Sequence, residues 1–550
     1  MEFDYVIVGG GPAGCVLANR LSEDDSISVC VLEAGMRDRH PYIRMPAGFA
    51  KLTKGLADWG WSTVAQSHIG ARPYLYPQGK VVGGGSSINA QLYNRGNAKD
   101  FDRWEAEAGC TGWAFRDCLP YFRRTEGNEV WQNEYHNSEG PLGVSYPVNP
   151  IPISKAYIRA GQQAAIPYNT DFNGPSQAGV GFYQLTQRDA KRCSAADAYL
   201  HPALKRGNVT LLHQAQALRI MVEKGRATGV AYSEKLQNKT VRARREVLVT
   251  SGAIGSPRLL LLSGIGPEGE LKAIGIETVA DIPGVGRNLQ DHVDVYVVSE
   301  LNGDFSYDHV AKPHHTLWAG LQYILFRKGP VASNLAEAGG FWYADEAAEY
   351  PDIQFHFMLG SGLEQDLERL KNDGVTLNTA FLRPRSRGTV RLKSSDPLAA
   401  PLIDPNYWAD PYDKEMSIRG FRLGRKIMAQ DAFKPYVKGE ALPGPYVETD
   451  EEIAEYAGKH AKTDYHPIGT CAMGPDDSRD AVVDLQLRVR GVEGLRVCDS
   501  SAMPLLVSAN TNAATIMLAE RAADIIRGLE PLAPANVNPR EIAHPAHKIA

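Results

Sequence analysis

"FDYVIVGGGPAGCVLANRLSED", residues 3 to 24, is the stretch that decides the fold. An apolar run from Tyr5 to Val8 predicts a strand, three glycines follow it, and apolar residues then recur with helical spacing. Gly9, Gly11 and Gly14 fill the pattern G-x-G-x-x-G. In this pattern the first glycine allows a tight turn, the second lets the backbone approach a pyrophosphate, and the third lets the helix pack on the strand. The free N–H groups at the start of such a helix favour a phosphate, so the stretch predicts a nucleotide-binding strand, turn and helix.

The next strand extends this prediction to an adenine dinucleotide. "SVCVLEAG" (28–35) ends in Glu33, which follows the last glycine of the turn by about 20 residues, the interval at which an acidic side chain binds a ribose hydroxyl. A glycine pattern alone is a weak signal, but here both strands, the helix and the acid are present. The pattern does not distinguish NAD from FAD.

Composition limits the other classes of protein. At 550 residues the chain exceeds what one hydrophobic core usually serves, so two domains or one large two-lobed unit are expected. The 59 Lys and Arg and 64 Asp and Glu residues give a net charge of −5 without long like-charge blocks, which argues against a nucleic-acid groove or a polybasic membrane anchor. Seven cysteines form no CxxC pair, which disfavours a structural metal or a disulfide scaffold and fits a reducing compartment. No leader pattern opens the chain and no apolar run approaches the ~20 residues that cross a bilayer, so a cytoplasmic location and a small-molecule partner are expected.

Two further glycine-rich stretches leave alternatives open. "YPQGKVVGGGSSINAQLYNRG" (76–96) predicts either a loop whose backbone lies against a flat or charged group, or a mobile surface loop. "VTSGAIGSPRLLLLSGIG" (249–266) predicts a strand, a glycine turn and a helix, which serve either a ligand or only the structure.

These stretches resemble the glucose-methanol-choline (GMC) oxidoreductases, which are FAD-dependent alcohol oxidases and dehydrogenases. The resemblance also rests on "IPGVGRNLQDH" (282–292), "PRSRG" (384–388), "YHPIGTCAMG" (465–474) and "CDSSAMPLLVSANTNAATIMLAERAAD" (498–524). It runs in order from Met1 to about Arg527. The motif "GKVVGGGSSINAQLYNRGN" is similar to the corresponding sequence in the branch of bacterial choline dehydrogenases and aliphatic alcohol dehydrogenases. The resemblance therefore implies FAD as the cofactor.

The resemblance implies an α/β fold in which a Rossmann-like FAD-binding domain carries an inserted substrate domain on a largely antiparallel sheet. The residues agree in part, because "DIQFHFML" (352–359) and "GTVRLKS" (388–394) predict strands of an antiparallel sheet. The expected divisions are 1–155, 203–295 and 463–530 for the FAD-binding domain, 156–202 and 296–462 for the substrate domain, and 531–550 for a tail.

Several residues match positions that bind FAD in this family: Gly9, Gly11, Gly14, Glu33, Gly84, Asn89, Ala217, Asp499 and Asn512. Asp499 matches a contact to the flavin chain near the pyrophosphate, although from the residues alone it can equally cap a helix. Ile88 stands where some relatives carry a histidine bonded covalently to the flavin, so non-covalent FAD is expected.

The resemblance also implies the catalytic residues. His466 matches the histidine beside the reactive nitrogen of the flavin, and an imidazole with a pKa near ~6.5 is suited to accept the alcohol proton while a hydride moves to flavin N5. Pro467 restricts the backbone of His466 and so narrows the directions in which its ring can point. Asn510 matches the partner position, where it can hold the alcohol by a hydrogen bond but cannot carry a proton, and Asn512 is the alternative residue for this role.

The substrate is less well indicated. Glu337 matches a carboxylate that choline-acting members set against a quaternary ammonium, and Trp59, Trp61 and Phe357 offer ring faces for a cation or belong to an ordinary core. Similar wording around Glu337 occurs in members that oxidise uncharged alcohols. A primary alcohol with an apolar or polyether chain is therefore favoured over choline.

No metal site is expected. The adjacent histidines His314 and His315 have no partner at metal spacing, and a surface loop is expected there.

The electron acceptor is expected to be a quinone or another acceptor than oxygen, which is compatible with peripheral association with the inner membrane. The alternatives are an alcohol or choline oxidase that uses oxygen, or a hydroxynitrile lyase of the same family. A nicotinamide-dependent dehydrogenase leaves the second and third glycine-rich stretches without a role. The oligomeric state is open.

Overall fold

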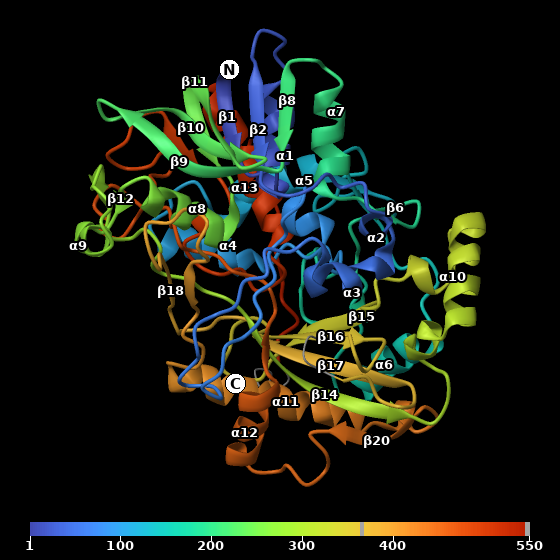
Figure 1. Cartoon of the computed structure of the whole chain (residues 1–550). Coiled ribbons are helices and arrows are strands. Elements are labelled where there is room, and N and C mark those ends of the chain that lie inside the picture. The colour runs from blue at the N-terminus through green and yellow to red at the C-terminus, as the bar shows by residue number, and fades with distance from the viewer. Residues whose placement is uncertain (364–367, 545–550) are drawn as a thin grey trace.

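The chain folds around two seven-stranded sheets, which lie in the upper and lower halves of Figure 1. This computed structural model describes residues 1–363 and 368–544. The mixture of parallel strands, antiparallel strands and packed helices confirms the expected α/β architecture.

The first sheet contains the predicted nucleotide-binding start. Its order is β8-β2-β1-β11-β10-β9, with β22 paired to β11. The strands β8, β2, β1, β11 and β22 run parallel, while β9, β10 and β11 form an antiparallel edge. The bounds are β1 (Glu2–Val8), β2 (Val29–Glu33), β8 (Val209–His213), β9 (Ala215–Glu223), β10 (Arg226–Glu234), β11 (Gln237–Val249) and β22 (Leu495–Val497). The near-continuous apolar runs of β1 and β2 fit strands that are buried on both faces.

Helices from opposite ends of the chain cover this sheet. α1 (Pro12–Leu21) starts at the glycine turn with proline in its first turn, where the missing N–H costs nothing. α13 (Asn512–Arg527) packs along α1 and against α5 (Phe115–Thr125), and it is buried over most of its length. Residues near 15 and near 518 therefore lie side by side.

The second sheet is antiparallel, as expected. Its order is β20-β14-β17-β16-β15-β5, with β21 paired to β14. The bounds are β5 (Gly179–Phe182), β14 (Val293–Leu301), β15 (Ala338–Trp342), β16 (Ile353–Met358), β17 (Gly374–Phe381), β20 (Val437–Leu442) and β21 (Lys462–Thr463). The helices α6 (Pro152–Gln163) and α11 (Pro411–Met428) pack on this sheet and close its core.

The two predicted strands have different positions. The stretch 352–359 contains β16, in the middle of the second sheet. The stretch 388–394 contains β18 (Thr389–Arg391), which pairs with β19 (Leu402–Asp404) in a separate two-stranded sheet.

The strands of the two sheets alternate along the chain. The second sheet takes one strand from before residue 200 and the others from 293–463, while the first sheet takes its strands from 2–33, 209–249 and 495–497. The expected domain boundaries stay a prediction. Residues 531–544 form no helix or strand, yet they dock on the protein: the Ala535 N–H donates to the Arg116 carbonyl at 2.8 Å, and the Glu541 carboxylate accepts from Asn97 Nδ2 at 2.7 Å.

The prediction of a surface loop at His314 and His315 is wrong. Both residues lie in the first turn of a helix, α10 (Pro313–Phe326), which Figure 1 shows at the edge of the molecule. Pro313 at the first position is compatible with helix initiation, and an apolar run follows it.

Candidate active site

One cavity brings the predicted cofactor residues and the predicted catalytic residues together. It is lined by all three glycine-rich stretches, at Gly9, Gly84 and Gly252, and also by His466 and Asn510. Of the residues expected to bind the cofactor, those on the lining are Gly9, Gly11, Glu33, Gly84, Asn89, Ala217, Asp499 and Asn512. The second and third glycine-rich stretches both border this cavity, which is the position expected if they serve a ligand.

The glycines of the turn are required by close backbone approach. Gly9 has φ +111°, and a Cβ there would lie 2.4 Å from the carbonyl oxygen of Thr250. Gly84 has φ +53°, and its Cβ would lie 2.8 Å from the Cα of Gly11, so the second glycine-rich loop packs directly on the first. Gly14 does not line the cavity. It packs against the turn instead, because a Cβ there would lie 2.0 Å from the Gly9 carbonyl oxygen. Gly14 therefore permits helix α1 to approach the turn.

Glu33 lies at the end of β2 with its carboxylate buried on the cavity wall. Its Oε2 accepts from the Gly10 N–H at 2.9 Å, and its Oε1 accepts from the Gly35 N–H at 2.7 Å. Burial raises the pKa of this carboxyl to about 7, although both amide hydrogen bonds oppose the shift. Each carboxylate oxygen has a second acceptor position, which a ribose hydroxyl would satisfy.

Three helices begin at the cavity: α1, α13 and α8 (Gly252–Leu262). No side chain caps the first turns of α1 and α13, so their N–H groups and helix dipoles favour an anionic or strongly accepting group. Asp499 caps α8, because its Oδ2 accepts from the Gly252 N–H at 2.9 Å and from Ser256 Oγ at 2.6 Å. The glycine cradle, the buried acid and the helix starts together fit an adenine dinucleotide with its two phosphates.

His466 follows β21 and is held on its backbone side. Its N–H donates to Asp291 Oδ1 at 2.8 Å. The buried Asp291 carboxylate also accepts from the hydroxyls of Tyr76 at 2.9 Å and Thr463 at 2.6 Å. The preceding residue, Tyr465, has φ +64°. The ring therefore projects from a backbone with little freedom.

The position of the proton on His466 follows from its neighbours. Nε2 of His292 lies 2.9 Å from the carbonyl oxygen of Leu382, which can only accept, so His292 carries its proton on Nε2 and is an acceptor at Nδ1. Burial lowers the pKa of His292 to about 3, so this imidazole is neutral. Nδ1 of His466 lies 3.0 Å from Nδ1 of His292 and 3.2 Å from Oδ2 of Asp464, and because both neighbours accept, Nδ1 carries the proton. The lone pair of His466 is consequently on Nε2.

The surroundings of His466 keep its imidazole neutral. Burial lowers its pKa well below the usual histidine value, and His292 lowers it further. The imidazole is thus neutral near pH 7.

Asn510, two residues before the start of helix α13, is the hydrogen-bond partner of His466. Its Nδ2 donates to Nε2 of His466 at 3.0 Å, while its Oδ1 accepts from Nδ2 of Asn94 at 2.8 Å and from Nε2 of Gln354 at 3.1 Å. The two donors that bond Oδ1 and the lone pair on His466 Nε2 all require the Asn510 amide to point its Nδ2 towards His466. Asn512 also lines the cavity, but Asn510 is the residue bonded to His466.

The chain on both sides of Asn94 is clamped by one side chain. Asn173 donates from Nδ2 to the Tyr93 carbonyl at 2.9 Å and accepts on Oδ1 from the Arg95 N–H at 2.8 Å. These bonds hold the peptide groups before and after Asn94, so the direction of the Asn94 side chain is fixed.

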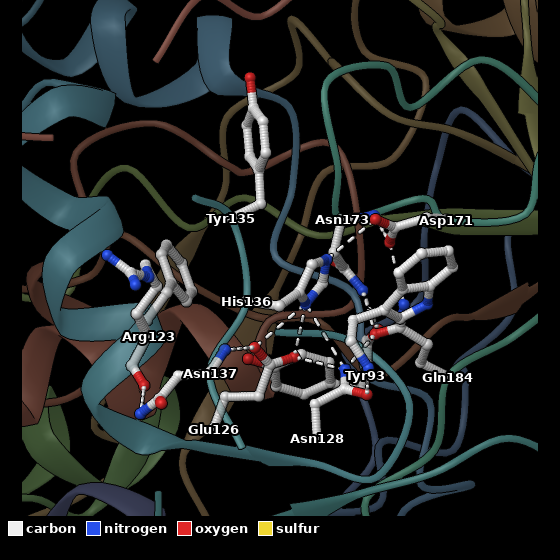
Figure 2. Close-up of polar contacts among 12 residues, drawn as sticks. Tyr93, Arg123, Glu126, Asn128, Tyr135, His136, Asn137, Asp171, Asn173 and Gln184 are labelled. Carbon is white, nitrogen blue, oxygen red and sulfur yellow. Dashed lines mark hydrogen bonds and ion pairs between the residues drawn. The ribbon is translucent and has the colours of Figure 1, made fainter. Parts of the chain in front are cut away.

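A buried ionic network lies behind this clamp (Figure 2). His136 approaches Glu126 with Nδ1 at 3.0 Å and Asp171 with Nε2 at 2.9 Å, and Arg95 bonds Glu126 at 2.7 Å. Burial alone would lower the pKa of His136, but the Asp171 and Glu126 carboxylates raise it overall. Because each ring nitrogen of His136 faces a carboxylate acceptor, the geometry favours the cationic ring, in which both nitrogens donate.

Of the predicted substrate residues, some line the cavity and others do not. Trp61 lines the cavity and stacks on Trp59, with ring centroids 4.8 Å apart. Glu337 and Phe357 are not on the lining. The Glu337 carboxylate accepts four hydrogen bonds, from Ile151 N–H, Ser154 Oγ, Tyr307 OH and Ser333 Oγ, at 2.8–3.0 Å.

Phe357 points away from the cavity as well. It stacks on Tyr157 at 4.7 Å between ring centroids, within the core of the second sheet. Glu337 and Phe357 therefore do not line the cavity in this arrangement, and their contact with a substrate stays a prediction. Phe49, Leu92, Ala336, Met358 and Leu363 form one apolar group on the cavity lining, whereas the lining next to His466 also carries the charged residues Asp464 and Lys462.

The functional residues not expected from the sequence are His292, Asn94, Gln354 and Asn173. His292 closes the quoted stretch 282–292 and Asn94 lies within 76–96, so two of them were inside recognised motifs. Gln354 and Asn173 stand outside these motifs and carry no local signal.

Sequence comparisons agree with this geometry. The family description "GMC oxidoreductase" matches residues 3–294 with its N-terminal part and residues 384–519 with its C-terminal part. An alcohol dehydrogenase [acceptor] from Pseudomonas putida is 43% identical over 532 residues, which cover 95% of each chain. An oxygen-dependent choline dehydrogenase from Brucella ovis is 42% identical over 545 residues, which cover 98% of this chain and 99% of the relative.

Solved structures are similar over nearly the whole chain. The pyridoxine 4-oxidase from "Mesorbium loti" is 30% identical with a TM-score of 0.86, and the match covers 96% of this chain and 100% of that one. A formate oxidase from Aspergillus oryzae is 27% identical with a TM-score of 0.89 over 96% of this chain and 98% of that one.

Proposed function

The chain belongs to the GMC oxidoreductase family and acts on alcohols, and we propose that it oxidises a primary alcohol to the aldehyde with His466 as the base. The observation that carries this proposal is the contact between Nε2 of His466 and Nδ2 of Asn510 at 3.0 Å, in the same cavity as the dinucleotide-binding glycines.

An alcohol hydroxyl would replace the direct hydrogen bond between these two atoms, which at 3.0 Å leave no room between them. Its hydrogen would be donated to the lone pair on His466 Nε2, and its oxygen would accept from Asn510 Nδ2. As the hydride leaves the alcohol carbon, the hydroxyl proton moves to Nε2 and the carbon–oxygen bond becomes a carbonyl. Asn510 stabilises the developing negative charge on oxygen, and the buried, neutral environment of His466 keeps the base unprotonated beforehand.

Bound FAD would supply the acceptor for this hydride at N5 of its isoalloxazine ring. The residues proposed to hold it are the eight cavity-lining positions named above, with Gly14 supporting the turn. We propose that the FAD is not covalently attached. Ile88 lines the cavity at the position where some relatives have a covalently bonded histidine, and an isoleucine side chain cannot form that bond. Acid precipitation should leave the flavin in the supernatant; a flavin that stays with the polypeptide contradicts this.

We propose that the substrate is an uncharged primary alcohol with an apolar or polyether chain. The apolar group on the cavity lining supports this, as does Glu337, which is buried, hydrogen-bonded and not on the lining. Choline is the second candidate, since oxygen-dependent choline dehydrogenases are among the relatives. Comparison of kcat/KM for medium-chain alcohols, glycol ethers and choline decides between them, and a strong preference for choline overturns this order.

We propose that the electrons pass to a quinone or another acceptor than oxygen. The support is the similarity to an alcohol dehydrogenase whose name specifies an acceptor. Peroxide formed at the rate of alcohol consumption would instead establish an oxidase.

The deciding experiment for the reaction class is anaerobic mixing of the purified holoenzyme with a panel of alcohols. Oxidation requires the absorbance of the bound flavin to bleach with one equivalent of aldehyde formed. A hydroxynitrile lyase would release aldehyde and cyanide from a cyanohydrin while the flavin absorbance stays unchanged.

A further inference from the structure

Helix α10 is unusual among the helices of this protein, because it is apolar and yet exposed. Its sequence is PHHTLWAGLQYILF, and Ala319 and Tyr323 are its buried residues. Tyr323 anchors the helix, with its hydroxyl donating to the Ala190 carbonyl at 3.1 Å. The neighbouring segments η5 (Asp308–Ala311) and η6 (Pro330–Ala332) pack against its two ends.

Six large apolar side chains project from this helix, each 42–67% exposed: Leu317, Trp318, Leu321, Ile324, Leu325 and Phe326. We call these six residues the apolar patch. Other exposed large apolar residues are scattered along the described chain and need no explanation. A helix that is apolar all round is normally buried in a protein core or in lipid, and a contiguous exposed patch marks an interaction surface.

The charges within the segment that carries the patch are all of one sign. Residues 309–333 contain Lys312, Arg327 and Lys328, all exposed, and no Asp or Glu. The cations flank both ends of the apolar run, and Trp318 carries the amphipathic ring that is enriched at membrane–water interfaces. This is the pattern of a helix that lies in the plane of an anionic membrane surface.

A second copy of the chain is a poorer occupant. A two-fold symmetric contact sets the same patch against itself, which gathers the Lys312, Arg327 and Lys328 charges of both copies without an acid in 309–333 to neutralise them. An anionic bilayer neutralises these charges and buries the apolar side chains at once. Among the described residues no helix is long and apolar enough to cross a membrane, so the contact would be interfacial.

We propose that the apolar patch of α10 docks the enzyme on an anionic lipid bilayer. The segment η6 below α10 packs on η1 (Pro46–Gly48), which continues into α3 (Phe49–Lys51), and Phe49 lines the cavity. Docking therefore brings the side of the molecule that carries Phe49 towards the bilayer, where apolar alcohols and quinones accumulate. The lipid contact does not depend on the proposed reaction, so failure of either inference leaves the other intact.

The test is binding of the FAD-loaded, full-length enzyme to vesicles, measured by flotation. Phosphatidylcholine vesicles with and without phosphatidylglycerol are compared, for the wild type and for the double variant Trp318→Ser with Leu325→Ser. Loss of two apolar contacts is expected to lower the partition coefficient about 100-fold, at roughly tenfold for each side chain. The matched control is Leu236→Ser with Tyr446→Ser, which removes two side chains that are 95% and 90% exposed outside the patch and should leave binding unchanged.

A second variant tests the charge. Arg327→Gln with Lys328→Gln should weaken binding to anionic vesicles about 25-fold, near fivefold for each cation, and should have little effect on neutral vesicles. Flavin content and turnover with a soluble dye should be unchanged in every variant. The proposal is overturned if the wild type fails to float with anionic vesicles, if the control pair weakens binding as much as the patch pair, or if light scattering shows a dimer that the patch variants dissociate.

Discussion

Substitution of Asn94 by alanine tests whether the orientation of the Asn510 amide controls the reaction. Oδ1 of Asn510 accepts from two donors, Asn94 at 2.8 Å and Gln354 at 3.1 Å, and these bonds direct Nδ2 towards His466. Asn94→Ala removes one donor, and a buried hydrogen bond contributes about 0.5–1.5 kcal/mol net. Since 1.36 kcal/mol corresponds to a factor of ten in rate, flavin reduction should slow by about 2- to 13-fold.

The double variant Asn94→Ala with Gln354→Leu removes both donors and leaves the amide free to turn over. Oδ1 of Asn510 could then face Nε2 of His466. That contact is repulsive while Nε2 carries a lone pair, and it favours the tautomer with the proton on Nε2, which cannot act as a base. The combined loss should exceed the product of the two single losses and approach that of Asn510→Ala.

The assay is the anaerobic flavin-reduction rate with FAD occupancy measured in the same samples. The control is Asn169→Ala, because Asn169 donates to the carbonyls of Ser176 and Ala178 and does not line the cavity. Wild-type rates in Asn94→Ala, together with single and double losses that simply multiply, would refute the positioning argument.

Three further results are expected. The flavin-reduction rate should stay constant as the pH falls from 8 through the usual histidine range, because the pKa of His466 is lowered well below it; an acid limb near pH 6.5 contradicts this. Gly9→Ala should lose FAD, seen as a lower ratio of flavin to protein absorbance, since its Cβ would meet the Thr250 oxygen at 2.4 Å with φ at +111°. His136→Ala should destabilise the protein by about 3–5 kcal/mol because it leaves Glu126 and Asp171 without their shared cation. The pKa of His136 is raised, so this contribution is complete below the unfolded-state pKa and is lost as the pH rises; unfolding midpoints of both proteins at pH 6 and pH 9 should show the difference shrinking.

The sequence predicted the parts of the site that rest on backbone geometry. Gly9 and Gly84 are recognisable because a left-handed backbone and close approach exclude other residues, and His466 precedes a proline that limits its direction. The two sheets and the pairing of His466 with Asn510 follow from motifs that lie far apart in the chain.

Side-chain direction decides which residues of a strand reach the cavity. In β16 the residues His356 and Met358 line the cavity and Gln354 bonds Asn510 on the same side, while Phe355 and Phe357 face the core. Polar and apolar residues alternate from Asp352 to Phe357, so the sequence itself places Phe357 on the same face as Ile353 and Phe355, which is the core face. The same one-residue difference separates Ala336, on the cavity wall, from Glu337 behind it.

The tautomer of His466, in contrast, was out of reach of the sequence. It depends on His292, whose Nε2 proton is fixed by the carbonyl of Leu382, 90 residues further along the chain. No local pattern connects these three residues, and only the folded arrangement brings them together.

The central claim is that His466 accepts the alcohol proton, and the most direct measurement is the anaerobic rate of flavin reduction in His466→Ala with FAD occupancy determined alongside. FAD should remain bound, because the glycine turns and Glu33 are untouched, while the rate should fall by roughly 10² to 10⁴, the range for a lost general base. Asn510→Ala should cost less, since the proton acceptor stays in place. A His466→Ala enzyme that retains its FAD and reduces it at near wild-type speed would contradict the mechanism.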